Sequence, residues 1–155
     1  MAPENNKRLQ AALSTSLKAD GFRKSGATWR KHFVESIGVL NIQGSQWGPS
    51  FYINLGVYFR PLGKSEAPNE YDCHIRCRLD DLVPNRHRLV EILDFDQDLD
   101  LSVRARELEV AVLQHGIPWL ERCSTTAGAA DYASTLPATS AWVTKEAREF
   151  LRAAR

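Results

Sequence analysis

Polar residues that suit molecular recognition alternate with apolar ones along several stretches of the chain. In NIQGSQWG, which begins at residue 41, the polar residues Asn41, Gln43 and Ser45 occupy alternate positions. FYINLGVYF and CHIRCRL continue the alternation with tyrosine, asparagine, histidine and arginine. A period of two predicts a strand that turns one face toward a core and the other away from it. The polar face predicted in this way carries Arg30, His32, Asn41, Gln43, Tyr52, Asn54, Tyr58, His74, Arg76 and Arg78. Tyrosine and arginine are enriched where proteins bind one another, so this face is the candidate binding site.

Three other interpretations of this face stay open. An antiparallel sheet commonly leaves one face in water, which needs no function. A pocket of His32, His74, Arg76 and Tyr52 would suit a small-ligand binder or an enzyme, although no carboxylate on the strands is placed to orient either imidazole ring. A weaker alternative lays single-stranded nucleic acid over Tyr52 and Tyr58 as stacking platforms. We therefore assign no catalytic residue.

The motifs that would hold a metal or a cofactor are incomplete. DFDQDLDLS places aspartates at 94, 96, 98 and 100, but an EF-hand loop starting there needs glycine at 99 and glutamate at 105, where the chain has leucine and alanine. Cys73 and His74 are neighbours that a strand points to opposite faces, so they cannot share a zinc ion. Glycines near residue 56 lack phosphate-loop spacing. We expect no metal and no cofactor, and an acidic loop whose last aspartate caps the following helix or whose charges contact a basic partner.

The elements that would position the polar face form an α+β fold. Strands are predicted at 28–34, 37–45, 50–59 and 72–79, which gives a four-stranded antiparallel meander with helices packed on one face. We expect a single domain over 1–155, with an N-terminal helix, the sheet at 28–79 and C-terminal helices at 84–155.

Two turns set the predicted register of the sheet. A two-residue turn at Glu35 and Ser36 pairs Arg30 with Asn41, and a loop at 46–49 pairs Asn41 with Asn54. Both registers join polar residues to polar ones. The apolar face then holds Trp29, Phe33, Leu40, Ile42, Phe51, Ile53, Leu55, Val57, Phe59, Cys73, Ile75, Cys77 and Leu79.

The predicted helices carry their own boundary signals. Gly21 can end the first helix and let Phe22 fold back on Leu17, and Gly116 is expected to end the helix that begins near residue 101. Thr144 is a plausible N-cap for a last helix that docks through its apolar side. The small residues of 124–141 fit short helical turns or loops.

Bulk properties narrow the function classes. A chain of 155 residues can bury a sizeable core without a metal or disulfide. The net charge of +1 argues against a protein that neutralises many phosphates, so nucleic acid is an unlikely partner. Cys73 and Cys77 on one strand would lie about 13 Å apart, too far for a disulfide. Free thiols, the lack of a signal core and the lack of a long apolar run predict a cytoplasmic protein outside the membrane.

The order GFRKSGATWRK, VLNIQGSQWGPSFYINLGVYF, CHIRCRL and HGIPWLERC resembles the bacterial domain-of-unknown-function family numbered 4304. The resemblance covers roughly residues 6 to 133. It implies a small cytoplasmic α+β domain and brings no reaction, cofactor or catalytic set. From the residues themselves, we expect a non-catalytic domain that binds another protein through its polar sheet face and acidic loop, in the manner of an immunity protein that neutralises a toxin.

Overall fold

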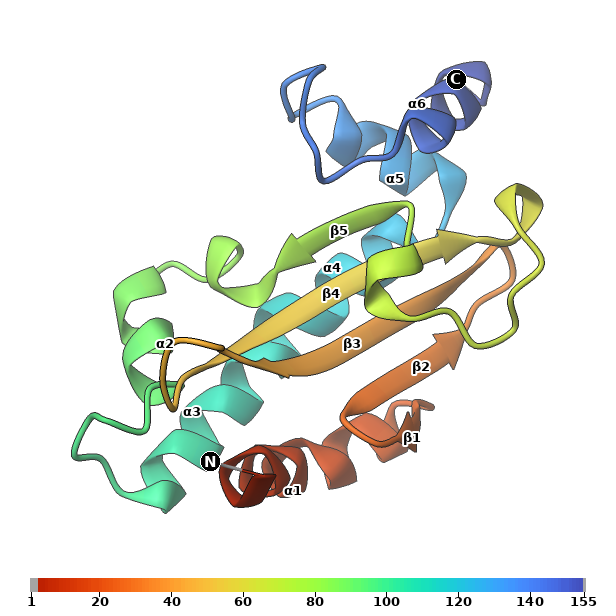
Figure 1. Ribbon diagram of the computed structural model, residues 1–155. Coiled ribbons are helices and arrows are strands. Elements are labelled where there is room, and N and C mark those ends of the chain that lie inside the picture. The colour runs from red at the N-terminus through yellow and green to blue at the C-terminus, as the bar shows by residue number, and fades with distance from the viewer. Residues whose placement is uncertain (1–2, 155) are drawn as a thin grey trace.

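The computed structural model describes residues 3–154 and contains an open antiparallel sheet with helices behind it (Figure 1). Its strands are β1 (Arg23–Ser25), β2 (Thr28–His32), β3 (Ser36–Gly44), β4 (Phe51–Phe59) and β5 (Ile75–Arg78). They follow one another across the sheet in chain order. The predicted α+β class and the antiparallel meander are therefore confirmed, but the sheet has five strands rather than four.

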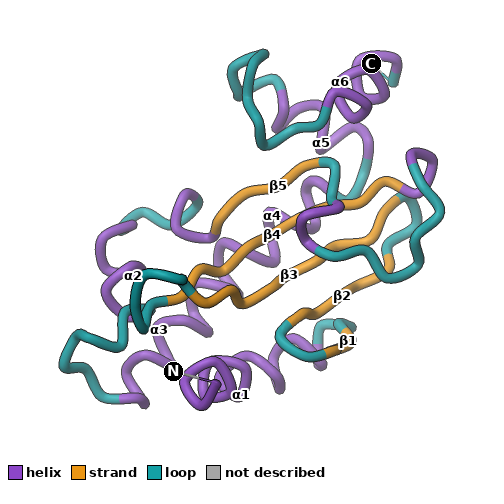
Figure 2. The backbone as a smooth tube through the Cα atoms, in the orientation of Figure 1, coloured by secondary structure: helices purple, strands orange, loops and turns teal. Residues whose placement is uncertain are grey.

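The helices lie mainly on one side of the sheet (Figures 1 and 2). They are α1 (Pro3–Ala19), α2 (Arg86–Ile92), α3 (Leu101–Ala111), α4 (Ile117–Cys123), α5 (Thr126–Ala133) and α6 (Lys145–Ala153). Short 3₁₀ turns occur at Arg60–Leu62, Glu70–Asp72 and Leu79–Asp81. One cluster of buried apolar side chains runs from Leu9 on α1 through the sheet to Leu151 on α6. In residues 3–154 no helix is long and apolar enough to cross a membrane.

The fifth strand, β1, lies at the sheet edge and carries no alternation that the sequence could reveal. All three of its residues are exposed, so neither face has an apolar signal. Gly26, with a φ of 61°, makes the tight turn that folds β1 onto β2. This conformation is easily adopted only by glycine. The added strand extends the sheet beyond the predicted start at residue 28.

The register between β3 and β4 is confirmed, with Asn41 opposite Asn54 and Gln43 opposite Tyr52. The predicted register between β2 and β3 is wrong by two residues, because Arg30 lies opposite Val39 rather than Asn41. The turn comes one residue earlier than predicted, and the Phe33 N–H donates to the Ser36 carbonyl. A shift of two residues preserves the face of every side chain, so the face assignment of β2 survives the error.

Ser36 explains where that turn falls. Its side chain is fully buried, and its hydroxyl donates to the Ser124 carbonyl at 2.7 Å. The neighbouring Glu35 carboxylate accepts bonds from the backbone and hydroxyl of Thr126. These contacts fix Ser36 in β3 and leave Val34 exposed at the turn, which pattern reasoning from β2 and β3 alone does not reveal.

Helix α3 does not end at Gly116, as its sequence predicted. It passes into a π-helical segment at Val112–Gly116 and then directly into α4. Gly116 has ordinary helical angles, and a Cβ there would lie 3.3 Å from Leu79. Glycine is used here for close packing on the sheet rather than for a left-handed helix end. Gly21, in contrast, has a φ of 96° and ends α1 as expected, with Phe22 N–H bonded to the Leu17 carbonyl.

The second face of the sheet is half covered. The chain between β4 and β5, residues 60–74, crosses in front of the strands, on the side opposite the helices (Figure 1). We call it the cover segment. Cys73 of this segment and the sheet residues Ile37, Val39 and Tyr58 form a small apolar cluster. Cys73 was predicted on the helix-covered face, but it lies before β5 and packs on the opposite face, where a Cβ at Gly56 would be 2.7 Å from its sulfur.

Candidate functional site

The part of the polar face outside the cover segment is formed by Asn41, Gln43, Tyr52, Asn54 and Arg78, of which Asn54 is itself buried, and we call it the open half. Its amides are joined across the strands. Asn54 Nδ2 donates to Gln43 Oε1 at 2.8 Å, and Asn41 Nδ2 donates to Thr28 Oγ1 at 2.9 Å. Gln43 is exposed and its own NH₂ group donates to no acceptor in residues 3–154. The network therefore orients Gln43 and leaves its donors free for another molecule.

Arg78 is the most distinctive residue of the open half. Its guanidinium carbon lies 4.0 Å from the centre of the Tyr52 ring, which is close stacking. Its Nε is buried and has no hydrogen-bond partner among the described residues. Within residues 3–154 the guanidinium forms no ion pair. Arg78 is thus stacked on an aromatic ring, and its terminal nitrogens, which bond to no acceptor among residues 3–154, can donate to a carboxylate or carbonyl of a partner.

A projecting tryptophan borders the open half. The loop between β3 and β4 carries Trp47, whose exposed fraction is 86%. This loop starts next to the Gln43–Tyr52 pair and is tied to the acidic loop at 94–100, because Phe95 N–H donates to the Pro49 carbonyl. The open half, Trp47 and the acidic loop lie at the loop end of the β3–β4 hairpin, and together we call them the hairpin-end surface.

The acidic loop is organised by a buried arginine that the sequence did not single out. Arg104 on α3 is 2% exposed, and its guanidinium donates to the carbonyls of Ile92, Asp94, Gln97 and Leu99. Burial lowers the pKa of Arg104, and the nearby Asp94 opposes that shift. The predicted capping by Asp100 is wrong in detail: Asp100 occupies the N-cap position of α3, but its side chain makes no capping bond. The loop carboxylates are therefore held at the surface by a cation beneath them.

Three of the predicted site residues serve the covered half instead. Tyr58 is buried, and its hydroxyl accepts a bond from Ser65 N–H in the cover segment. The Nδ1 atom of His74 accepts the Phe59 N–H at 2.9 Å, and its ring packs against Tyr58. Burial lowers the pKa of His74, with partial opposition from Glu146. These contacts give both side chains a structural role.

Arg76 completes the covered half. Its guanidinium makes two bonds to the carboxylate of Glu70, at 2.7 and 3.2 Å. The Glu70 side chain is only 8% exposed, so this ion pair ties the cover segment to β5. Its neighbour Arg78, two residues along the same strand, makes no such contact. Strand β5 thus carries one arginine with a structural role, Arg76, and one without an ion pair among residues 3–154, Arg78.

Arg30 and His32 lie at the β2 margin of the polar face. Arg30 Nε donates to the Pro68 carbonyl, and Arg60 approaches His32 Nδ1 at 3.0 Å. Strands β3 and β4 separate β2 from β5, so His32 and His74 lie about 14 Å apart at three strand spacings. The structure therefore does not bring His32 and His74 together with Tyr52 and Arg76 in one pocket.

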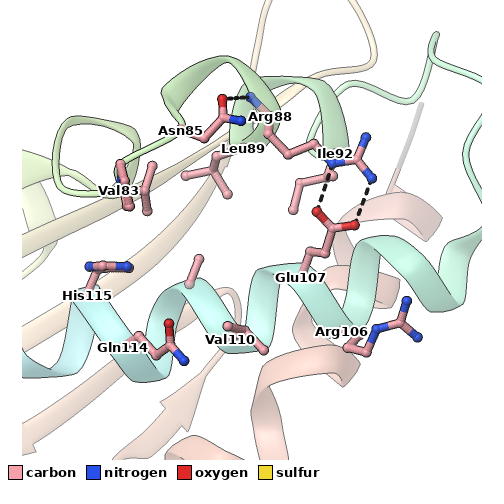
Figure 3. Close-up of a pocket in the computed structure, with 12 residues that line it drawn as sticks. Val83, Asn85, Arg88, Leu89, Ile92, Arg106, Glu107, Val110, Gln114 and His115 are labelled. Atoms are coloured by element: carbon pink, nitrogen blue, oxygen red, sulfur yellow. Dashed lines mark hydrogen bonds and ion pairs between the residues drawn. The ribbon is translucent and has the colours of Figure 1, made fainter.

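A separate apolar pocket of about 290 Å³ lies between α2 and α3 (Figure 3). Leu89, Ile92 and Val110 contribute its apolar wall. Arg88 reaches from α2 to Glu107 on α3 with two bonds, which close one end. That hydrogen bonding lowers the pKa of Glu107. The pocket can hold a small apolar group, and it contains none of the residues predicted for the site.

The cysteines offer no nucleophile. All three are free and buried. Burial raises the pKa of Cys123 to about 12 and also raises the pKa values of Cys73 and Cys77. A thiol must lose its proton to act as a nucleophile, so these side chains behave as small apolar groups near neutral pH. Among residues 3–154 no three His, Cys, Asp or Glu side chains gather as a metal site.

Sequence reasoning missed Trp47, Glu70 and Arg104. Trp47 had a usable signal, because a large aromatic residue inside the turn sequence QWGP has no strand or helix face to bury it. Glu70 and Arg104 had none, since their partners are a distant strand residue and backbone carbonyls.

A family model described as Domain of unknown function (DUF4304) matches residues 13–122. Comparison with curated proteins and with solved structures gives no match.

Proposed function

Because the chain belongs to the DUF4304 family, whose description names no activity, we propose from the geometry alone that it is a non-catalytic domain that binds another protein through its hairpin-end surface. The observation that carries this proposal is Arg78, stacked on Tyr52 with no hydrogen-bond acceptor among residues 3–154. Tryptophan, tyrosine and arginine dominate the energetics of protein interfaces, and this surface presents all three together.

The charges of the hairpin-end surface indicate which chemical groups a partner should carry. The acidic loop at 94–100 favours a partner with basic residues, and Arg78 requires an acceptor such as a carboxylate within the same contact. A toxin neutralised by an immunity-type protein in the cytoplasm is the specific partner class that we propose. The small size of the domain supports an immunity-type role. The separation of His32 from His74 supports it too, because the two histidines share no pocket.

Capture from a lysate of the native host tests the proposal. We expect the parent protein to retain a specific protein that the Trp47→Ala/Arg78→Glu variant loses. The charge-matched control Arg8→Glu changes an exposed residue of α1 and should retain it. Mass spectrometry identifies the captured protein, and thermal melts verify that all variants are folded. Equal capture by both variants contradicts the proposed surface.

A further inference from the structure

Two arginines face each other directly at the sheet edge. In the register of β1 and β2, Arg23 lies opposite Arg30. Directly opposed residues of antiparallel strands project to the same face with their Cβ atoms about 5 Å apart, and like charges there are unfavourable. In residues 3–154 no ion pair involves Arg23, Lys24 or Arg30. The repulsion between the arginines is therefore not relieved by a carboxylate of the described residues.

The arginine pair borders a cleft of about 520 Å³ between the β1–β2 hairpin and the cover segment. Its lining consists of Gly21, Arg23, Lys24, Ser25, Arg30, His32, Glu66 and Ala67. The volume lies within the range of small-molecule sites, which is roughly 300 to 1,000 Å³. Glu66 is the carboxylate among these residues, but its side chain is 81% exposed and lies 3.9 Å from Arg60. The wall of the cleft is thus strongly cationic.

The donors of this cleft are partly fixed in place. Arg30 uses Nε for the Pro68 carbonyl, which holds its side chain and leaves its two terminal nitrogens without a protein acceptor in the described chain. Arg60 lies 3.0 Å from His32 Nδ1, and since arginine can only donate, Nδ1 is the acceptor and Nε2 carries the proton. A guanidinium fork and an imidazole N–H are therefore available beside Arg23.

Protection of the sheet edge accounts for only part of this arrangement. Positive side chains on an outer strand discourage pairing with another sheet, and Arg23 and Lys24 on β1 serve that purpose. Edge protection does not require a second arginine on β2 directly opposite the first, nor a histidine two residues further along. An anion bound between the arginines would turn their repulsion into attraction.

We propose that this cleft is a binding site for the phosphate group of a small phosphorylated molecule. A phosphate monoester presents three terminal oxygens, which two guanidinium groups can bind with paired hydrogen bonds. The site lies across β2 from the open half and shares none of the residues of the hairpin-end surface, so it stands independently of the proposed protein partner.

Titration of the ¹⁵N-labelled full chain with phenyl phosphate tests this site. We expect saturable NMR shifts confined to residues 21–32 and 64–68, and no such shifts with sodium chloride at equal ionic strength. Arg23→Gln should weaken binding at least tenfold, whereas Arg8→Gln on α1 should leave it unchanged. A phosphoserine peptide forms a second arm. Binding of that peptide at least tenfold tighter than phenyl phosphate would assign the phosphate to a protein and overturn the small-molecule proposal.

Thermal melting separates a binding role from a structural one. Without ligand, Arg23→Gln should melt at or above the temperature of the parent, because the substitution removes a repulsion. Phenyl phosphate should raise the melting temperature of the parent but not that of the variant. Non-saturable shifts, or shifts that Arg23→Gln leaves intact, would overturn the proposed site.

Discussion

The two halves of the polar sheet face share one sequence pattern but have different environments. In the covered half, Tyr58, His74 and Arg76 each contact the cover segment or the backbone of β4. In the open half, Gln43, Tyr52 and Arg78 lie beyond the reach of that segment. Alternation therefore identifies which side chains share a face, while a connection elsewhere in the chain decides which of them are available to a partner.

Substitutions at Arg76 and Arg78 should show the largest contrast between the halves. Arg76→Glu places a carboxylate against the buried Glu70 and should cost about 2–4 kcal/mol of unfolding free energy. Arg78→Glu loses only the stacking on Tyr52 and should cost about 1 kcal/mol or less. Urea unfolding of both variants measures the difference. Equal costs would mean that the two halves are not energetically distinct.

A smaller effect is expected from the pH dependence of His74. Its pKa is lowered in the folded protein, so the unfolded chain binds the proton more tightly and protonation favours unfolding. The neutral ring is needed to accept the Phe59 N–H. Stability from this group should be complete above the unfolded-chain pKa of about 6.5 and should decline as the pH falls below it, by roughly 1 kcal/mol for one lost hydrogen bond.

His74→Asn provides the control for this effect, because the amide oxygen can accept the same N–H without titrating. Chemical unfolding at pH 7.5 and pH 5.5 should show a greater loss for the parent than for the variant. An identical loss in both proteins would place the pH sensitivity elsewhere.

The parts of the fold predicted from the sequence are those where apolar and polar residue types alternate. Residues 40–43 of β3 and 51–55 of β4 alternate in this way, and the predicted register between the two strands was correct. Strand β1 was missed because Arg23, Lys24 and Ser25 are all exposed. The β2–β3 register was wrong because Ser36 is fixed by a contact with Ser124, 88 positions away in the chain. Such long-range contacts leave no local period in the sequence.

The candidate site was likewise predictable only in part. The ten predicted residues were placed on one face, but the cover segment has no repeating pattern from which the burial of Tyr58, or of its own His74, could be predicted. The arginine pair at Arg23 and Arg30 could not be inferred without β1. Local periodicity thus predicted which side chains share the polar face. The irregular connections determined which of those side chains are accessible.

Photo-cross-linking at the two exposed hairpin tips tests the central claim most directly. A benzophenone amino acid replaces Trp47 at the β3–β4 tip or Val34, which is 95% exposed at the β2–β3 tip, so neither change disturbs the core. In the native host, position 47 should form a cross-link to one protein that position 34 does not reach. Absence of a cross-link at 47, or the same products at both tips, would contradict a binding role for the hairpin-end surface.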